Sequence, residues 1–408
     1  MRRWGALVLA FVSAAVLTAC QPAGGGGSSA WEPVPEAPAL PEEPEASEEA
    51  LPVAPAPMPL PTSIFAETGR HDYRVVHDFA EDSRVPTGVW KHAGGYTMKY
   101  YIDGGVSVRE GASGAFADSR ELFRIEGQHM MEEMDVNDRY IVWRESEVEN
   151  GYVTEITLYY YDRQTGEKKV ALAFDVDSEK GIYYPYYGLE LSGSRFVCLT
   201  QNTAISEEAS FSAYDMQKQG FETIVSWRWI DGEVFTPVED FLVRGDLLVY
   251  SITNSEVPEK NNAIYVYDLV NRRQMAELHL DGEPWEIGSN MLRDIDYDPA
   301  TGIFAFFADT DGDARSRSIA WMKEGEPEPH IIEETLGDFP TIGIDNGVVY
   351  YQEHTYNGQE EALFAVAYDT ATGDANYIPD CYHVDSYDGQ IYGLRQAEGE
   401  AAQLIEFE

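Results

Sequence analysis

Short stretches of alternating apolar and polar residues dominate the chain from about residue 72 onward, without helical periodicity. One stretch recurs seven times, each time after a turn of small or acidic residues, at intervals of about 42 to 57 residues. The copies are Gly95–Tyr101, Asp138–Trp143, Ser194–Leu199, Asp246–Tyr250, Gly302–Phe307, Gly347–Tyr351 and Gly389–Gly393. Because alternation places one strand face in a core between sheets, the pattern predicts an all-β protein.

A second type of strand follows most of these copies and ends in an aromatic residue and an aspartate. Examples are Leu158–Asp162, Phe211–Asp215, Ile264–Asp268 and Phe364–Asp369. Such an aspartate begins a turn by accepting hydrogen bonds from amides further along the chain, and a following glycine tolerates positive φ. Four strands per unit at this period predict a β-propeller with seven four-stranded blades. Six or eight blades, or a pair of β-sandwiches, are the alternatives.

The two ends of the repeat region complement each other. The seventh unit has only two strands before Glu408, and Asp72–Phe79 has the pattern of the missing outer strand. We therefore predict that the N- and C-terminal strands pair and close the ring, which removes exposed sheet edges.

One unit has a more specific signature, between Asp296 and Asp313. Asp298-Pro299-Ala300-Thr301-Gly302 precedes an apolar strand, which leads to Asp309-Thr310-Asp311-Gly312. This is similar to the repeat of TolB-type, WD40-like propellers, in which a Ser-Pro-Asp-Gly turn precedes the strand and an Asp-x-x-Gly loop follows it. Asp298 stands where the family has serine, and two residues separate Pro299 from Gly302. The resemblance covers the architecture of residues 63–408 and implies a fold, with the function left open.

The first residues resemble the signal peptide of a bacterial lipoprotein. Arg2 and Arg3 precede an apolar stretch, Trp4–Leu17, which at about 14 residues is too short to span a membrane. Leu17-Thr18-Ala19-Cys20 then resembles the lipobox, in which the cysteine is acylated and the chain is cut directly before it. The resemblance implies that residues 1–19 are removed and that lipidated Cys20 anchors the protein on the extracytoplasmic side of a bacterial membrane. The alternative is an ordinary secretory signal with an incidental cysteine.

Residues 20–62 are predicted to be a disordered tether. Gly24–Gly27 is flexible, and the Pro/Glu/Ala-rich sequence that follows cannot bury enough apolar surface to fold. At about 3.1 Å per residue, this tether could reach roughly 130 Å from the membrane. A passive spacer is the favoured interpretation, and a proline-rich docking motif is the alternative.

Charge narrows the range of partners. The chain carries 72 acidic and 28 basic residues and a net charge of −44. This charge argues against nucleic acid, anionic lipid surfaces and strongly anionic polymers as partners. The apolar fraction of 44% is nevertheless large enough for an extensive core.

Catalytic and cofactor motifs are absent from the sequence. Gly-x-Ser-x-Gly does not occur, and the eight histidines form neither His-x-His nor His-Glu-x-x-His. Cys198 and Cys381 lie in units that are not neighbours, so we predict two buried free thiols. No cofactor is predicted, and no catalytic residue can be assigned.

Two groups of aspartates suggest a cation. Asp309, Asp311 and Asp313 alternate in a turn and are candidate ligands of a structural calcium ion, although the glycine and the twelfth position do not follow an EF-hand. A solvated hairpin turn is the alternative. Asp294, Asp296 and Asp298 also alternate and would share one strand face, where their repulsion suggests either a cation or exposure to solvent.

Aromatic residues provide a candidate platform for a sugar or a peptide. These residues are Tyr183, Tyr184, Tyr186, Tyr187, Trp227, Trp229 and Trp285. Packing between blades would explain most of them equally well.

The sequence therefore predicts a lipid-anchored propeller that acts as a noncatalytic binding or scaffolding module. Its partners would be the membrane, through Cys20, and a protein or glycan ligand at one face of the propeller. The main alternative is a glycosidase-like enzyme that acts on an extracellular polymer through two carboxylates in the central funnel. A quinone-dependent oxidoreductase is a third hypothesis.

Overall fold

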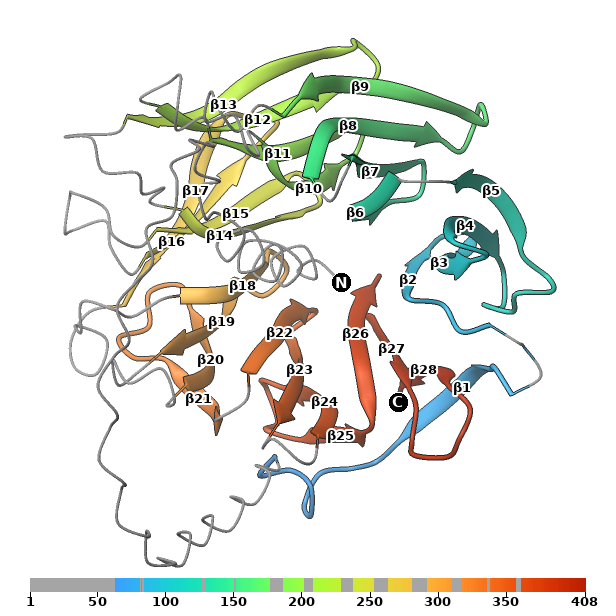
Figure 1. The fold of residues 1–408 in the computed structure, drawn as a ribbon. Helices are drawn as coiled ribbons and strands as arrows, with labels where there is room; N and C mark the ends of the chain where they lie inside the picture. The colour runs from blue at the N-terminus through green and yellow to red at the C-terminus, as the bar shows by residue number, and fades with distance from the viewer. Residues whose placement is uncertain are drawn as a thin grey trace, which may run out of the picture.

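All seven repeated stretches form the second strand of a four-stranded antiparallel sheet in the computed structural model (Figure 1). The structure describes residues 63–80, 82, 84–126, 129–149, 152–176, 186–201, 208–228, 238–252, 263–280, 292–309, 317–335, 338–356 and 361–408. These residues contain 28 strands in seven sheets and no α-helix. The prediction of seven blades is thereby confirmed.

The sheets are arranged around a central axis, with the first strand of each blade innermost (Figure 1). From blade 1 to blade 7 these inner strands are β2 (Gly88–His92), β6 (His129–Val136), β10 (Tyr186–Ser192), β14 (Val238–Arg244), β18 (Leu292–Asp298), β22 (Asp338–Asp345) and β26 (Cys381–Tyr387). The second strands are β3 (Gly95–Ile102), β7 (Tyr140–Glu149), β11 (Arg195–Gln201), β15 (Leu247–Ile252), β19 (Ile303–Asp309), β23 (Val348–Tyr356) and β27 (Gln390–Arg395).

The two outer positions of each blade complete the sheets. The third strands are β4 (Gly105–Gly111), β8 (Tyr152–Asp162), β12 (Glu208–Asp215), β16 (Ala263–Asp268), β20 (Arg317–Lys323), β24 (Glu361–Asp369) and β28 (Gln403–Phe407). The outermost strands are β5 (Arg120–Ile125), β9 (Glu167–Asp175), β13 (Gly220–Arg228), β17 (Arg273–His279), β21 (His330–Thr335), β25 (Ala375–Pro379) and β1 (Tyr73–Asp78).

Blade 7 closes the ring as predicted. Its outermost strand is β1, which pairs antiparallel with β28 from Tyr73 opposite Phe407 to Asp78 opposite Gln403. Buried Glu406 of β28 also accepts a hydrogen bond of 2.6 Å from Lys91 of blade 1. Hydrogen bonds between the ends of the chain and from blade 7 to blade 1 therefore hold the closure together.

The core consists of apolar layers between neighbouring blades, and strand β19 shows how the sequence builds them. Ile303, Ala305 and Phe307 pack against blade 6, whereas Phe304 and Phe306 pack against blade 4. A middle strand thus has a blade on each side, so both alternating faces are apolar. The seven apolar clusters span all seven blades, and the pairing of β1 with β28 closes the ring, so residues 63–408 form one continuous packed unit.

The aspartates that end the third strands cap the next turn, as their positions predicted. Asp268 Oδ1 accepts hydrogen bonds from the amides of Val270 and Asn271, at 2.9 and 2.8 Å. Asp369 Oδ1 does the same for the amide of Ala371 at 2.8 Å. These hydrogen bonds fix the turns between the third and fourth strands. Those turns lie on the same face of the disc as the turns between the first and second strands.

The two described cysteines, Cys198 and Cys381, are buried free thiols, as predicted. In the part of the chain that the structure describes, no helix is long and apolar enough to cross a membrane. The proposed signal peptide (1–19), Cys20 and the tether (20–62) lie outside the described residues.

Candidate functional site

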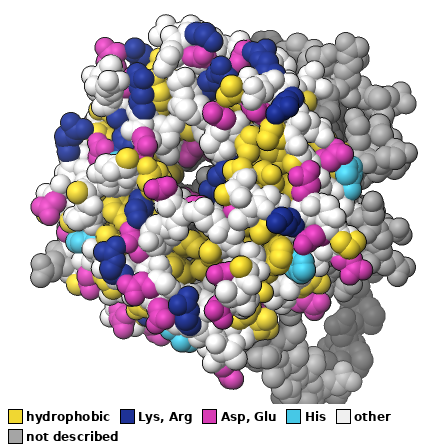
Figure 2. Space-filling model, turned by 180° about the vertical axis from the view of Figure 1, so that it is seen from behind, with side chains coloured by type: hydrophobic (Ala, Val, Ile, Leu, Met, Phe, Trp, Pro, Cys, Tyr) yellow, Lys and Arg dark blue, Asp and Glu magenta, His cyan; other side chains and the backbone are white. Residues whose placement is uncertain are grey.

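An axial cavity of about 670 Å³ opens among the turns that join the first and second strands of the blades. Its lining comes from blades 1, 2, 3, 4, 6 and 7, so this site is assembled from most of the chain. Five carboxylates line it: Asp135, Asp138, Asp345, Asp385 and Asp388. Three basic side chains also line it: Lys91, Arg139 and Arg244. Figure 2 shows a hollow near the middle of one face of the disc, with acidic and basic side chains beside it.

The acidic rim of the cavity consists of Asp138, Asp345 and Asp388. Tight hairpin turns fix two of these residues in position. Asn346-Gly347 and Asp388-Gly389 both have φ of 50° at the first residue and 78° at the glycine. Two successive positive φ values are typical of type I′ turns, which match the twist of the flanking strands. Asp345 Oδ2 accepts a hydrogen bond of 3.0 Å from the amide of Gly389, which ties one turn to the next. The rim is therefore held by backbone geometry.

Asp138 is held on the rim as an ionised carboxylate. Its Oδ1 accepts hydrogen bonds from the amide of Ala93 and from the hydroxyl of Tyr387, both at 2.9 Å. The amide of Ala93 is the main cause that lowers the pKa of Asp138. This side chain therefore carries a full negative charge at neutral pH.

Acidic residues of inner strands also link blade 2 through to blade 6 in succession. Asp135 of β6 accepts a hydrogen bond of 2.8 Å from the amide of Leu191 in β10, and Glu190 of β10 accepts one of 3.4 Å from the amide of Val243. Sequence reasoning missed these links. The sequence does place an acidic residue at a similar position in several inner strands. An acidic residue in a strand is usually exposed to solvent, so this repetition did not indicate a contact between blades.

Arg244 connects four blades across the wall of the cavity. From the end of β14 its guanidinium pairs with Asp296 of β18, donates a hydrogen bond of 2.7 Å to the carbonyl of Ile344, and lies 3.4 Å from Ser386 Oγ. Asp296 is fully buried and also accepts a hydrogen bond of 2.9 Å from the amide of Ile344. This arrangement neutralises a buried carboxylate with a side chain from the neighbouring blade.

The predicted alternation of Asp294, Asp296 and Asp298 holds only in part. Asp296 and Asp298 both face blade 6, where Asp298 accepts a hydrogen bond of 2.9 Å from the amide of Gly347. Asp294 departs from the alternation because it lies in a bulge and has a positive φ of 51°. The cation beside Asp296 is the guanidinium of Arg244.

The other sequence candidates fall mostly on parts of the chain whose structure is not described. Asp309 ends β19, whereas Asp311 and Asp313 lie outside the described residues, as do Tyr183, Tyr184, Trp229 and Trp285. Tyr186 and Tyr187 belong to β10, and Trp227 belongs to β13. Within the described ranges, no group of three or more His, Cys, Asp or Glu side chains is placed to hold a metal ion.

Two buried carboxyl groups with raised pKa, Glu333 and Glu353, lie between blades 5 and 6, away from the axial cavity. Burial raises the pKa of Glu353 to about 8, and nearby Glu333 adds to the effect. Glu333 accepts hydrogen bonds from the hydroxyl of Tyr351 at 2.5 Å and from the amide of Ile64 at 2.7 Å. Glu333 thereby holds the start of the described chain against the outer side of the propeller.

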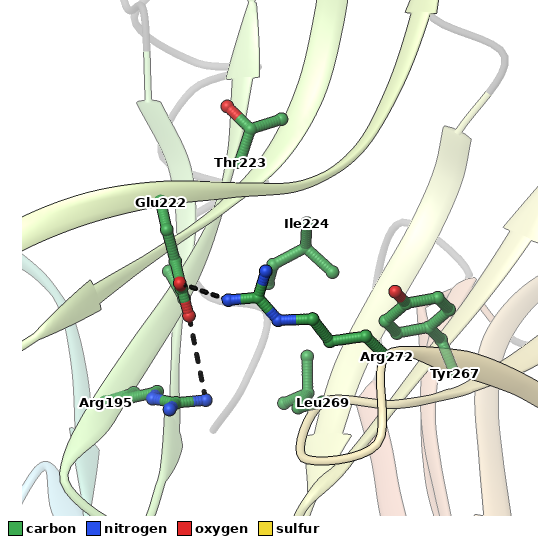
Figure 3. Close-up of a pocket in the computed structure, with 8 residues that line it drawn as sticks. Arg195, Glu222, Thr223, Ile224, Tyr267, Leu269 and Arg272 are labelled. Atoms are coloured by element: carbon green, nitrogen blue, oxygen red, sulfur yellow. Dashed lines mark hydrogen bonds and ion pairs between the residues drawn. The ribbon is translucent and has the colours of Figure 1, made fainter.

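A second, smaller cavity lies between blades 3 and 4 (Figure 3). Glu222 lies 3.7 Å from the guanidinium of Arg195 and 2.5 Å from that of Arg272, and both guanidinium groups point at its carboxylate. The cavity measures about 30 Å³, which is room for one water molecule. Because Glu222 already pairs with both Arg195 and Arg272, these arginines are not available to a ligand. The axial cavity is therefore the better candidate for a ligand site.

Several solved structures of known proteins are similar to this chain. An oligogalacturonate lyase from Vibrio parahaemolyticus superimposes with a TM-score of 0.48 and 11% identity, covering 83% of this chain and 97% of the lyase. TolB from Acinetobacter baumannii has a TM-score of 0.41 and 13% identity, covering 72% of this chain and 61% of TolB. An acylaminoacyl peptidase from Pyrococcus horikoshii has a TM-score of 0.49 and 12% identity, covering 80% and 51%.

These neighbours include enzymes and TolB, and likeness at this level decides nothing about activity. No family model matches the chain. The comparison with curated proteins likewise found no match. The chain is a seven-bladed β-propeller with TolB and oligogalacturonate lyase among its structural neighbours.

Proposed function

We propose that this protein is an extracytoplasmic lipoprotein whose propeller is a noncatalytic binding module with its ligand site in the axial cavity. The cavity of about 670 Å³ is the observation that carries the proposal, because ligand pockets commonly measure about 300–1,000 Å³. Its rim consists of tight turns fixed by hydrogen bonds between blades. A rigid rim lowers the entropy lost on binding.

The ionisation of Asp138 favours binding over glycan hydrolysis. An acid catalyst must keep its proton at neutral pH, which requires a raised pKa. The pKa of Asp138, on the rim, is lowered instead. Glu133, Glu333 and Glu353 have raised pKa values, but these residues do not line the axial cavity.

Blocking the cavity tests the binding function. Residues 63–408 would be screened by thermal unfolding against separate sets of amines, sugars, amino acids and organic acids. We expect compounds that raise the unfolding temperature to lose this effect in the double variant Ser194→Trp/Gln217→Trp, because both residues line the cavity. Val170→Trp is the matched control, since Val170 is 53% exposed on outer strand β9.

Mass spectrometry of the recovered compounds separates binding from catalysis. Unchanged compounds support a binding module. Turnover that the double variant abolishes would replace this proposal with an enzyme, and binding unaffected by the double variant would remove the axial cavity as the site.

Membrane anchoring is tested separately in the full chain. In a bacterial host fed a radiolabelled fatty acid, we expect the label in the mature protein and the protein in the membrane fraction. Cys20→Ser should abolish labelling and release the protein, since serine offers no thiol for the lipid. Cys198→Ser is the matched control, because Cys198 is a buried free thiol of β11. A Cys20→Ser chain that stays lipid-labelled would contradict the proposal.

A further inference from the structure

We propose that the ligand of the axial cavity is a small organic cation, bearing amine or guanidinium groups on a flexible chain. This inference rests on the proposed binding function and adds the chemical class of the ligand. It follows from how the basic side chains of the cavity are paired.

Carboxylates that do not line the cavity neutralise each of its three basic residues. Lys91 Nζ lies 2.6 Å from Glu406, and Arg139 lies 3.0 Å from Asp162. Arg244 pairs with Asp296 of β18. Each basic side chain of the lining therefore already pairs with a carboxylate outside the cavity. An anionic ligand would have to compete with these carboxylates for the basic side chains.

The acidic residues of the rim are held differently. Asp138 and Asp345 accept hydrogen bonds from the backbone amides of Ala93 and Gly389, which are neutral donors. Asp388 is exposed in the rim turn next to Gly389. The guanidinium of Arg163, which pairs with Glu110, adds only a smaller charge interaction with Asp138. Neutral donors therefore provide most of what fixes these carboxylates and leave their charge in place, so the mouth of the cavity keeps a negative potential.

Further features of the cavity act in the same direction. Asp135 and Asp385 add carboxylates to the lining beyond the rim. The hydroxyl of Tyr387 is a further neutral donor that fixes Asp138 in position. Low-dielectric walls around a mouth of net negative charge concentrate cations and raise their rate of association.

Three probes of equal chain length and different charge test the charge preference. Titration calorimetry on residues 63–408 would compare 1,6-diaminohexane, 1,6-hexanediol and adipate. We expect the diamine to bind at least about tenfold more tightly than the other two, and its affinity to fall as salt rises. The triple variant Asp138→Asn/Asp345→Asn/Asp388→Asn should weaken the diamine by about tenfold or more.

The variants are chosen so that the fold survives. Asparagine keeps an oxygen that can accept the amides of Ala93 and Gly389, and at position 388 it tolerates the φ of 50°. The control is Glu334→Gln, an exposed acidic residue of outer strand β21, which removes a charge from the same strongly acidic protein. The control should leave diamine binding unchanged.

The outcomes separate this inference from the proposed function. If adipate or the diol binds best and the Ser194→Trp/Gln217→Trp variant abolishes it, the binding module stands and the cationic ligand is wrong. Absence of diamine binding, or diamine binding that the triple variant and Glu334→Gln weaken equally, also overturns the inference. Diamine binding that the tryptophan variant leaves intact contradicts the axial cavity itself.

Discussion

Replacing Arg244 by methionine should destabilise the propeller by about 3–5 kcal/mol, the largest effect that we expect from a single substitution. Asp296 is fully buried, and the guanidinium of Arg244 is its charged partner. Methionine fills similar space but leaves the carboxylate buried without a counter-charge. The same change also removes the hydrogen bond to the carbonyl of Ile344 in blade 6. Urea unfolding of residues 63–408 at neutral pH would measure the loss.

Two comparison variants make this result specific. Arg139→Met removes an ion pair with Asp162, but the Arg139 side chain is 43% exposed and solvent screens the pair, so the loss of stability should be far smaller than for Arg244→Met. Adding Asp296→Asn to Arg244→Met should recover part of the loss, because the buried charge disappears while an acceptor for the amide of Ile344 remains. Equal losses for Arg244→Met and Arg139→Met would mean that Arg244 does not join the blades.

Replacing Glu353 by glutamine should stabilise the protein at pH 8 by about 2–4 kcal/mol and have little effect near pH 4.5. Glu353 is 2% exposed, and burial, aided by Glu333, raises its pKa to about 8. The folded state therefore holds this proton more tightly than the unfolded chain does. Stability is consequently lost as the pH rises from the ordinary carboxyl pKa toward 8. Glutamine carries no proton to lose, so the variant avoids this loss.

The measurement is the difference in unfolding free energy between Glu353→Gln and the unaltered chain across this pH range. Taking the difference cancels the titration of the many other acidic groups. Glu334→Gln removes an exposed carboxyl from strand β21 and should show no comparable rise with pH. A difference that stays constant with pH would show that Glu353 is not held protonated in the fold.

The blade pattern could be predicted because its causes are local. Each unit repeats a short apolar strand after a turn of small or acidic residues, although the structure packs both faces of strands such as Ile303–Asp309 and not only the one face expected. Aspartates such as Asp268 and Asp369 mark turns, because they bond amides two and three residues ahead. The closing strand was visible too, because a sheet that lacks one strand must find it elsewhere in the chain.

The candidate site could not be predicted, because its residues come from blades distant in the sequence. Asp138 meets Tyr387 of blade 7, and Arg244 meets Asp296 of blade 5. Acidic residues are so numerous in this chain that composition cannot distinguish a cavity-lining carboxylate from a solvated one. Asp296 shows the difficulty, since its place in an alternating acidic run suggested exposure or a metal ion, and its partner is an arginine 52 residues away.

The amino-acid sequence by itself determined the strands, their grouping into seven blades and the closure of the ring, because hydrophobic alternation and turn chemistry act over a few residues. Only the tertiary structure decided which carboxylates line the axial cavity and which neutralise its basic residues. Those roles depend on distances between blades and on burial, and charge interactions in a low-dielectric interior are set by both. The sequence contains an excess of acidic side chains. In the folded protein, some of them cap turns, others accept hydrogen bonds from the next blade, and others give the mouth of the axial cavity its negative charge.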